Sequence, residues 1–262
     1  MRVNAQQPPW RVIRAFPGAD GSCLVHLHNV SGGVLAGDRL SLVMDVERDC
    51  RVQVTTAGAT RLYRHREGSR PSEQTTKISV AEGGLLEYLP DALIPFAGSR
   101  HSQHTAITLA NDATLFWGET LAPGRQAMGE VFGFNTLRIR TELQSPSRPL
   151  LLENFALEPA QRLLSSAARL GPYTHMANFY ACRVGMPAAT WRELESALNQ
   201  FCCAHSRPGV TIWGATTLVA DGIAVRGLSV SARELPATLT SCWKIARRFL
   251  TGEEAIPPRK VY

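Results

Sequence analysis

A strand–turn–strand pattern that recurs along the chain is the feature that most constrains its fold. Three copies read "DRLSLVMDVERDCRVQVTT", "EQTTKISVAEGGLLEYLP" and "SQHTAITLANDATLFWGE". In each copy, two stretches with alternating apolar and polar residues flank a short polar turn, and the turns are centred near residues 48, 83 and 112. A unit that returns after about thirty residues is typical of stacked β layers, each of which buries its apolar face on its neighbours.

Two later segments repeat the plan less closely. They read "NTLRIRTELQSPSRPLLLENF" and "ATTLVADGIAVRGLSV", and Asp221-Gly222 in the second is a strong hairpin signal. An ordinary antiparallel sandwich with regularly spaced hairpins therefore stays open beside the solenoid. We expect a mainly β fold of stacked, helically arranged strands, solenoid-like or sandwich-like, in a single domain over residues 1–262.

Two α-helices are expected in the C-terminal region. In "PAATWRELESALNQFCCAH", Thr190 is the expected N-cap, with Glu193 completing a capping box. In "LPATLTSCWKIARRFLTGE", Pro236 suits the first turn and Gly252 the end of the helix. The expected buried stripes are Trp191, Leu194, Leu198, Phe201 and Cys202 in the first helix and Leu239, Cys242, Trp243, Ala246 and Leu250 in the second. A short helix is expected around residues 162–170.

Composition excludes several classes of protein. A hydrophobic content of 44% with 19% charged residues is typical of a folded globular chain. The net charge is +6, but the basic residues form only short groups such as "RLYRHR" and "KIARR", which we interpret as solvated faces; Arg247 and Arg248 also suit the negative end of a helix dipole. We find no nucleic-acid motif, no membrane-length apolar run and no signal-peptide core, and expect a cytoplasmic protein.

The segment "NVSGGVLAGDRL" has glycines at a spacing known from phosphate-binding loops. Gly32 and Gly37 match that spacing, but Asp38 and Arg39 stand where a lysine and a hydroxyl are required. A strand-like stretch follows instead of a helix, so the helix N-terminus that would face a phosphate is missing. The glycines instead predict a tight turn with positive φ.

Other chemical groupings are weaker. The six cysteines include no CxxC pair, which fits neither a disulfide framework nor a zinc module, and Cys202, Cys203 and His205 are better explained as helix core residues than as a catalytic set. His26 with His28, and His101 with His104, are possible but weak metal-ligand pairs. A carbohydrate-active β-helix enzyme remains an alternative, because several acids fall in expected loops or strand ends: Glu87, Asp91, Glu119 and Glu130.

Four motifs in order give the chain a family resemblance. The stretches "SGGVLAGDRL", "VTTAGATRLYR", "LEYLPDALIPFAGSR" and "ETLAPGRQAMGEVF", together with the ending "CWKIARRFLTGEEAIPPRKVY", resemble the UreD (UreH) family of urease accessory proteins. The chain departs from the family where Val30-Ser31 replaces the usual prolines, at Gly58, and at Tyr262, where a tryptophan is more usual. These departures affect turns and packing and could alter the fit to a particular partner.

The resemblance implies a protein that is not an enzyme. Relatives of this kind bind the urease apoprotein and a UreF-like protein, which docks the GTPase UreG, and nickel is thought to pass through the UreD-like protein as transient cargo, with no tightly bound cofactor. Candidate residues for a nickel path are Asp38, Thr55, Thr56, Glu87, Asp91 and Glu119. Candidate partner-binding residues are Tyr63, Arg64, Tyr88, Phe96 and Arg125. No nucleic acid or membrane partner is expected.

Overall fold

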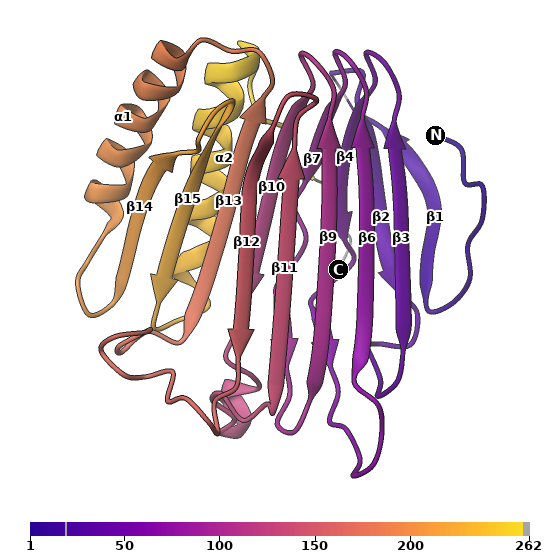
Figure 1. Ribbon diagram of the computed structural model, residues 1–262, viewed down its shortest axis with the longest axis vertical. Helices are drawn as coiled ribbons and strands as arrows, with labels where there is room; N and C mark the ends of the chain where they lie inside the picture. Colours follow the sequence, from indigo (N-terminus) through magenta and orange to yellow (C-terminus); the bar gives the residue numbers. More distant parts are fainter. Residues whose placement is uncertain (19, 259–262) are drawn as a thin grey trace.

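The computed structural model describes residues 1–18 and 20–258 and shows two β-sheets packed face to face (Figure 1). The smaller sheet contains, in spatial order, β12 (Pro149–Leu157), β11 (Thr136–Gln144), β9 (Arg100–Leu109), β6 (Ser72–Val80) and β3 (Arg39–Val46). The main path of the larger sheet is β1 (Trp10–Pro17), β2 (Cys23–Asn29), β4 (Arg51–Thr56), β7 (Leu85–Tyr88), β10 (Thr114–Leu121), β13 (His175–Arg183), β15 (Gly222–Ser229) and β14 (Thr211–Thr217). The short strands β5 (Thr60–Leu62) and β8 (Leu93–Pro95) pair beside this path.

The first half of the chain winds between the two sheets. Strands β2, β4, β7 and β10 pair in parallel in the larger sheet, and β3, β6, β9 and β11 pair in parallel in the smaller one. Each of the three closely matching repeats supplies one strand to each sheet, because its turn crosses from the smaller sheet to the larger. This winding confirms the solenoid-like expectation for these repeats.

The two looser repeats are hairpins. Strand β12 pairs antiparallel with β11, and β14 pairs antiparallel with β15. Asp221 has φ of 52° at the turn of the second hairpin, as its Asp-Gly sequence predicted. The chain therefore stops winding after β11 and extends the larger sheet with antiparallel strands.

The two ends of the solenoid differ. At the turn end, short connections join the sheets, and Asp49 and Asp112 adopt positive φ there. At the loop end, which is lower in Figure 1, the chain makes longer connections over residues 30–38, 57–71, 89–99 and 122–135. The four family-like motifs thus meet at one end of the molecule. Gly32 and Gly37 have φ of 76° and 79°, which confirms the predicted turn.

The interior changes character between these ends. Strand β6 alternates inward and outward residues; Ile78 and Val80, near the turn end, are buried in the apolar core between the sheets. The inward residues nearer the loop end are Thr76, Gln74 and Ser72, all buried. Period-two alternation therefore places polar side chains inside the solenoid as well as on its surface.

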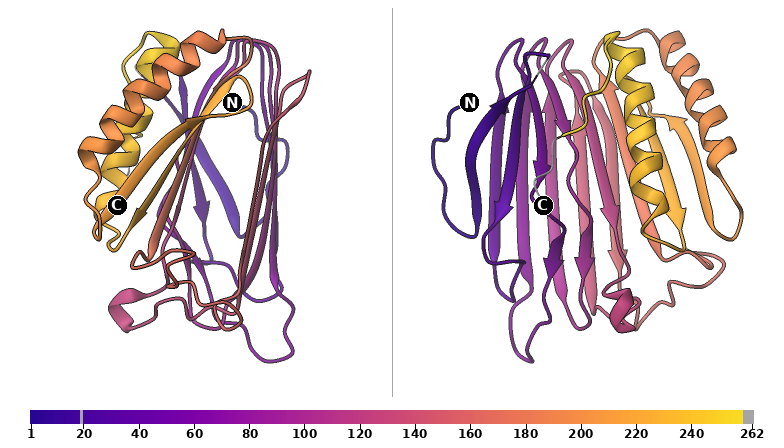
Figure 2. Two further views of the ribbon diagram at one scale, coloured as in Figure 1. Left: turned by 60° about the vertical axis from the view of Figure 1, so that its left-hand side comes forward. Right: turned by 180° about the vertical axis from the view of Figure 1, so that it is seen from behind.

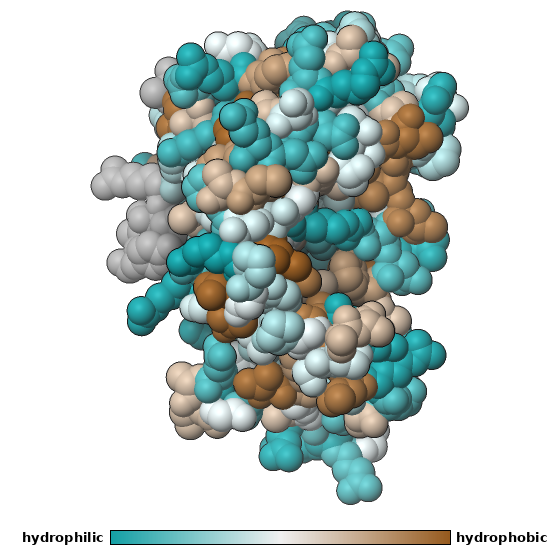
Figure 3. All heavy atoms as spheres, turned by 90° about the vertical axis from the view of Figure 1, so that its left-hand side faces the viewer, coloured by the Kyte–Doolittle hydropathy of each residue, from teal (hydrophilic) through white to brown (hydrophobic). Residues whose placement is uncertain are grey.

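Two helices cover the outer face of the larger sheet (Figure 2). Helix α1 spans Ala188–His205 and helix α2 spans Glu234–Thr251. Most of both predicted stripes is fully buried, with Phe201 and Leu239 partly buried, and Gly252 ends α2 in the left-handed conformation. Seen from the side of α1 and β14, the visible apolar residues lie in small separate groups (Figure 3).

Two predictions about helices were wrong. Helix α1 begins two residues before Thr190, with Pro187 at the N-cap and no side-chain hydrogen bond to cap it, so Thr190 lies inside the first turn. Residues 162–170 form consecutive turns and no helix. None of the helices within the described residues has the length and apolar character that a membrane span requires.

Candidate functional site

A cavity of about 330 Å³ lies between the two sheets toward the loop end. Its walls come from both sheets and from the loops that follow β4 and β7. Its polar lining includes Thr56, Gln74, Asp91, Gln103, Glu119 and Asn178. Three of the six predicted nickel-path residues, Thr56, Asp91 and Glu119, therefore share one internal space.

Glu119, on β10, lines this cavity, and its side chain lies between the two sheets. Its Oε1 accepts hydrogen bonds from Trp117 Nε1 at 2.9 Å and from Thr141 Oγ1 at 3.4 Å. Burial raises the pKa of Glu119 above its ordinary value. Within the described part of the chain, no lysine or arginine forms an ion pair with it. A cation bound in the cavity would therefore stabilise the charged form of the Glu119 carboxyl group.

Thr56 and Asp91 are fixed to each other on the cavity wall. The Asp91 backbone N–H donates to Thr56 Oγ1 at 2.8 Å, and Thr56 Oγ1 donates to Asp91 Oδ2 at 3.2 Å. These two hydrogen bonds hold the loop after β7 against the end of β4. They also fix the position of the Asp91 carboxylate in the cavity wall.

The other three predicted nickel-path residues lie elsewhere. The Asp38 carboxylate accepts a hydrogen bond from the Leu35 N–H at 2.8 Å and stabilises the turn before β3. Thr55 is buried and donates to the Leu89 carbonyl at 2.7 Å. Glu87 points away from the cavity, toward α2.

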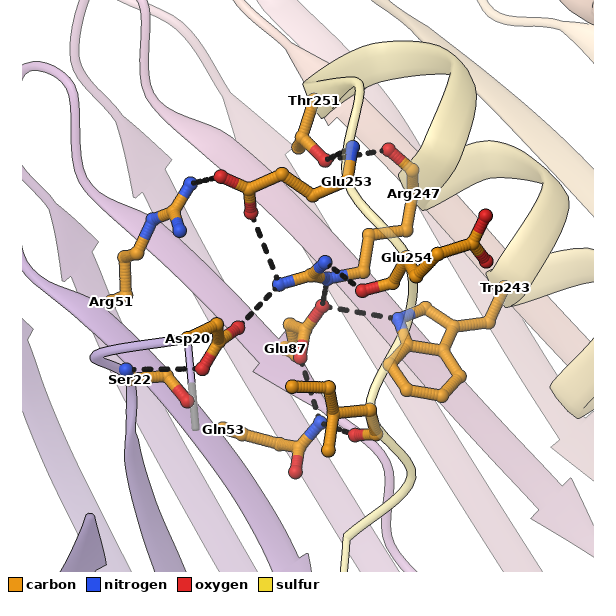
Figure 4. A network of polar contacts seen from close by, with 11 residues as sticks. Asp20, Ser22, Arg51, Gln53, Glu87, Trp243, Arg247, Thr251, Glu253 and Glu254 are labelled. Atoms are coloured by element: carbon orange, nitrogen blue, oxygen red, sulfur yellow. Dashed lines mark hydrogen bonds and ion pairs between the residues drawn. The ribbon is translucent and has the colours of Figure 1, made fainter. Parts of the chain in front are cut away.

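Glu87 is held by three donors in a buried network (Figure 4). Arg247 Nε donates to Glu87 Oε1 at 2.8 Å, and Trp243 Nε1 donates to the same oxygen at 3.2 Å. Gln53 Nε2 donates to Glu87 Oε2 at 2.7 Å and to the Ile256 carbonyl at 2.9 Å. These contacts tie the larger sheet to α2 and to the segment that follows it.

Arg247 is the centre of this network. Its Nη2 contacts Asp20 Oδ2 at 2.6 Å and lies 3.6 Å from Glu253, which also pairs with Arg51 at 2.8 Å. The Arg247 side chain is 2% exposed, so its interpretation as part of a solvated face was wrong. Arg247 follows Trp243 by four residues and so shares its buried side of α2, which is a signal that the sequence did contain.

Four of the five predicted partner-binding residues form one cluster at the loop end. The Tyr63 and Phe96 rings meet edge to face with centroids 5.3 Å apart, and the Arg125 guanidinium lies 4.4 Å from the centre of the Phe96 ring. Arg64 lies against Gly98, two residues beyond Phe96. The fifth, Tyr88, stacks on Trp117 with ring centroids 4.1 Å apart and lines the cavity.

The cysteine and histidine groupings are dispersed. Cys202 is fully buried, as expected of a core residue, while Cys203 and His205 are exposed, with His205 stacked on Phe201. The imidazole rings of His26 and His28 are 6.2 Å apart. Among the described residues, no three His, Cys, Asp or Glu side chains gather closely enough to hold a metal ion.

Comparison with known proteins places the chain among its relatives. The profile of the "UreD urease accessory protein" family matches residues 1–262. A protein named urease accessory protein UreD from Herpetosiphon aurantiacus is 42% identical over 262 residues, which is 100% of this chain and 91% of the relative. Proteins of the same name from Marinobacter nauticus and Bacillus sp. are 32% and 28% identical, over 96% and 90% of this chain and 82% and 84% of those relatives. With its solenoid-like fold and its four motifs at one end, the chain belongs to the UreD family of urease accessory proteins.

Proposed function

We propose that this protein is a cytoplasmic, non-enzymatic scaffold that binds the urease apoprotein and a UreF–UreG-like complex and conducts nickel toward the unfinished urease active site. The observation that supports it best is the polar cavity, in which Glu119 lies between the sheets without a cationic partner in the described residues. Family membership supplies the link to urease maturation.

The cavity suits transient passage of a divalent cation. Carboxylates, hydroxyls and amide carbonyls are oxygen ligands, and such ligands hold nickel more weakly than imidazoles and thiolates do. A path must bind the ion strongly enough to admit it and weakly enough to release it. Asp91 and Glu119 supply negative charge, while Thr56, Gln74 and Gln103 offer neutral oxygens along the same space.

Partner recognition is assigned to the loop end. Tyr63, Arg64, Phe96 and Arg125 combine aromatic and guanidinium groups, which are enriched in the centres of protein interfaces. Tyr88 takes a different role, as part of the cavity wall. Of the four acids behind the carbohydrate-active alternative, Glu87 is committed to Arg247 and Glu130 to Arg125, which leaves Asp91 and Glu119 in the cavity.

The test uses the double variant Asp91→Asn/Glu119→Gln. The tagged chain is co-expressed with its urease subunits and the UreF- and UreG-like proteins, the complex is purified and sized, and nickel per urease and urease activity are measured. The matched control, Glu82→Gln/Glu193→Gln, removes two exposed carboxylates away from the cavity.

We expect both variants to assemble the complex and only the cavity variant to deliver less nickel. Nickel content equal to wild type in the cavity variant would refute the path through this cavity. A wild-type chain that binds none of these proteins, and that urease activation does not need, would refute the scaffold function itself.

A further inference from the structure

The stretch from β5 to β6 concentrates positive charge. Arg61, Arg64, Arg66 and Arg70 are all exposed, and none forms an ion pair with a described residue; Arg61 Nη1 donates to the Gly32 carbonyl at 3.4 Å. The segment contains one acid, Glu67. Elsewhere the exposed arginines often have a carboxylate partner, as Arg48 has in Glu82 at 2.6 Å. We call these four residues the arginine face.

The arginine face stands on a fixed base. Leu62 is fully buried, and His65, 8% exposed, donates its backbone N–H to the Gly98 carbonyl at 3.2 Å. Within the loop, Ser69 Oγ donates to the Arg66 carbonyl at 2.6 Å, and Arg100 donates to the Ser69 carbonyl. The loop extends past the ends of the sheets (Figure 1). A backbone ordered in advance loses less entropy when a partner binds.

Apolar groups adjoin the arginine face. Phe96, in contact with Tyr63, leads to Arg125 and to the 3₁₀-helix η1 (Gln126–Met128), where Met128 is 72% exposed. Val131 in the same loop is 44% exposed. Arginine, aromatic and methionine side chains in one area are characteristic of protein interfaces, whereas a surface for phosphate alone needs no exposed apolar rim.

We propose that the arginine face docks a carboxylate-rich surface of a protein partner. This deepens the proposed function and rests on it, because the partner is taken to be a component of the urease maturation complex. The four arginines lie within ten residues of sequence and have no carboxylate partner among the described residues, so carboxylates of a partner protein could form charge-assisted hydrogen bonds with them. Such a surface accelerates association, since opposite charges steer the encounter.

The test compares two triple charge reversals. Arg64→Glu/Arg66→Glu/Arg70→Glu changes the arginine face. Arg148→Glu/Arg192→Glu/Arg233→Glu changes net charge equally, at exposed arginines distant in sequence from the loop. Association rates with purified urease apoprotein and with the purified UreF–UreG-like complex are measured at low and high salt. A glutamate-rich peptide and a DNA duplex serve as further probes.

We expect the arginine-face variant to lose about tenfold or more in association rate at low salt with at least one preparation, and to lose peptide binding, while the control keeps both. Wild-type rates in the arginine-face variant, or tighter binding to DNA than to either protein preparation, would overturn the proposal. Thermal unfolding checks the fold, and Arg64→Gln/Arg66→Gln/Arg70→Gln replaces the reversal should that variant misfold.

The proposed function can fail separately. A wild-type chain that binds neither protein preparation contradicts the proposed function. In that case, loss of peptide binding in the arginine-face variant alone would still support an acidic docking partner, and retained peptide binding would overturn it.

Discussion

Arg247→Met should be among the most destabilising single substitutions in this protein. Methionine preserves the unbranched apolar stem of the arginine side chain but removes the cation that faces Asp20 and Glu87. Glu87 is 3% exposed. Breaking a buried ion pair by removing one partner costs about 3–5 kcal/mol, because the remaining charge stays buried without compensation. For a chain of this size, about 2–4 °C per kcal/mol gives a fall of roughly 6–20 °C in the unfolding midpoint.

A double variant separates this cause from general damage to packing. Glu87→Met/Arg247→Met removes both buried charges, and replacing a buried pair by apolar residues is often close to neutral. The double variant should therefore be more stable than Arg247→Met, even though it carries one more substitution. The assay is urea unfolding, followed by circular dichroism and by the fluorescence of tryptophans such as Trp243, which contacts Glu87.

The neighbouring arginine provides the control. Arg248 has a side chain that is 74% exposed and pairs with the equally exposed Glu254, so Arg248→Met should change stability by no more than about 0.5 kcal/mol. A loss below about 1 kcal/mol for Arg247→Met would refute the reasoning. So would a double variant no more stable than the single one.

Three further predictions concern a titration, a turn and a helix start. Burial raises the pKa of Glu119, so the folded state binds more protons than the unfolded state and the free energy of unfolding falls as pH rises above the ordinary glutamate range. Glu119→Gln should therefore stabilise the protein at pH 8 but not at pH 4 in urea titrations, and an equal effect at both pH values would contradict this. Gly33→Ala should lower the free energy of unfolding by about 1–3 kcal/mol, because a Cβ there would lie 2.6 Å from the Arg61 carbonyl oxygen. Gly58→Ala is the control, because a Cβ at Gly58 would meet no atom within 4 Å. Equal thermal midpoints for the two variants would contradict this prediction. Thr190→Ala should leave thermal stability almost unchanged, because Thr190 caps nothing in α1, and a loss near 1 kcal/mol would mean that it does.

The sequence allowed the repeating strands to be predicted, but it left a wound solenoid and a sandwich of hairpins both open, and it did not show which way every polar side chain faces. Alternating residues and short polar turns identify strands locally, which is why β3, β6 and β9 fell within the predicted repeats. Alternation cannot tell which polar position faces solvent, a helix or an internal cavity. Glu87 and Glu119 both fall in strand-like segments, yet one faces α2 and the other the space between the sheets.

Two predictions made from local sequence signals, the start of α1 and the exposure of Arg247, were wrong. Thr190 and Glu193 have capping-box spacing, but the helix already begins at Ala188, so Thr190 is helical and does not occupy the N-cap position. Arg247 was predicted to face solvent because it is charged, although its position four residues after Trp243 puts it on the buried side of α2. The cluster of Tyr63, Phe96 and Arg125 could be proposed from motif resemblance, but its ring contacts depend on three loops that meet only in the folded protein.

The Arg247 network has a consequence for how the chain is made. Asp20 and Glu253 both contact the same guanidinium, although nearly the whole sequence separates them. During synthesis Asp20 and Glu87 emerge from the ribosome long before α2, which carries Arg247. The Arg247 network therefore cannot form until α2 has emerged from the ribosome.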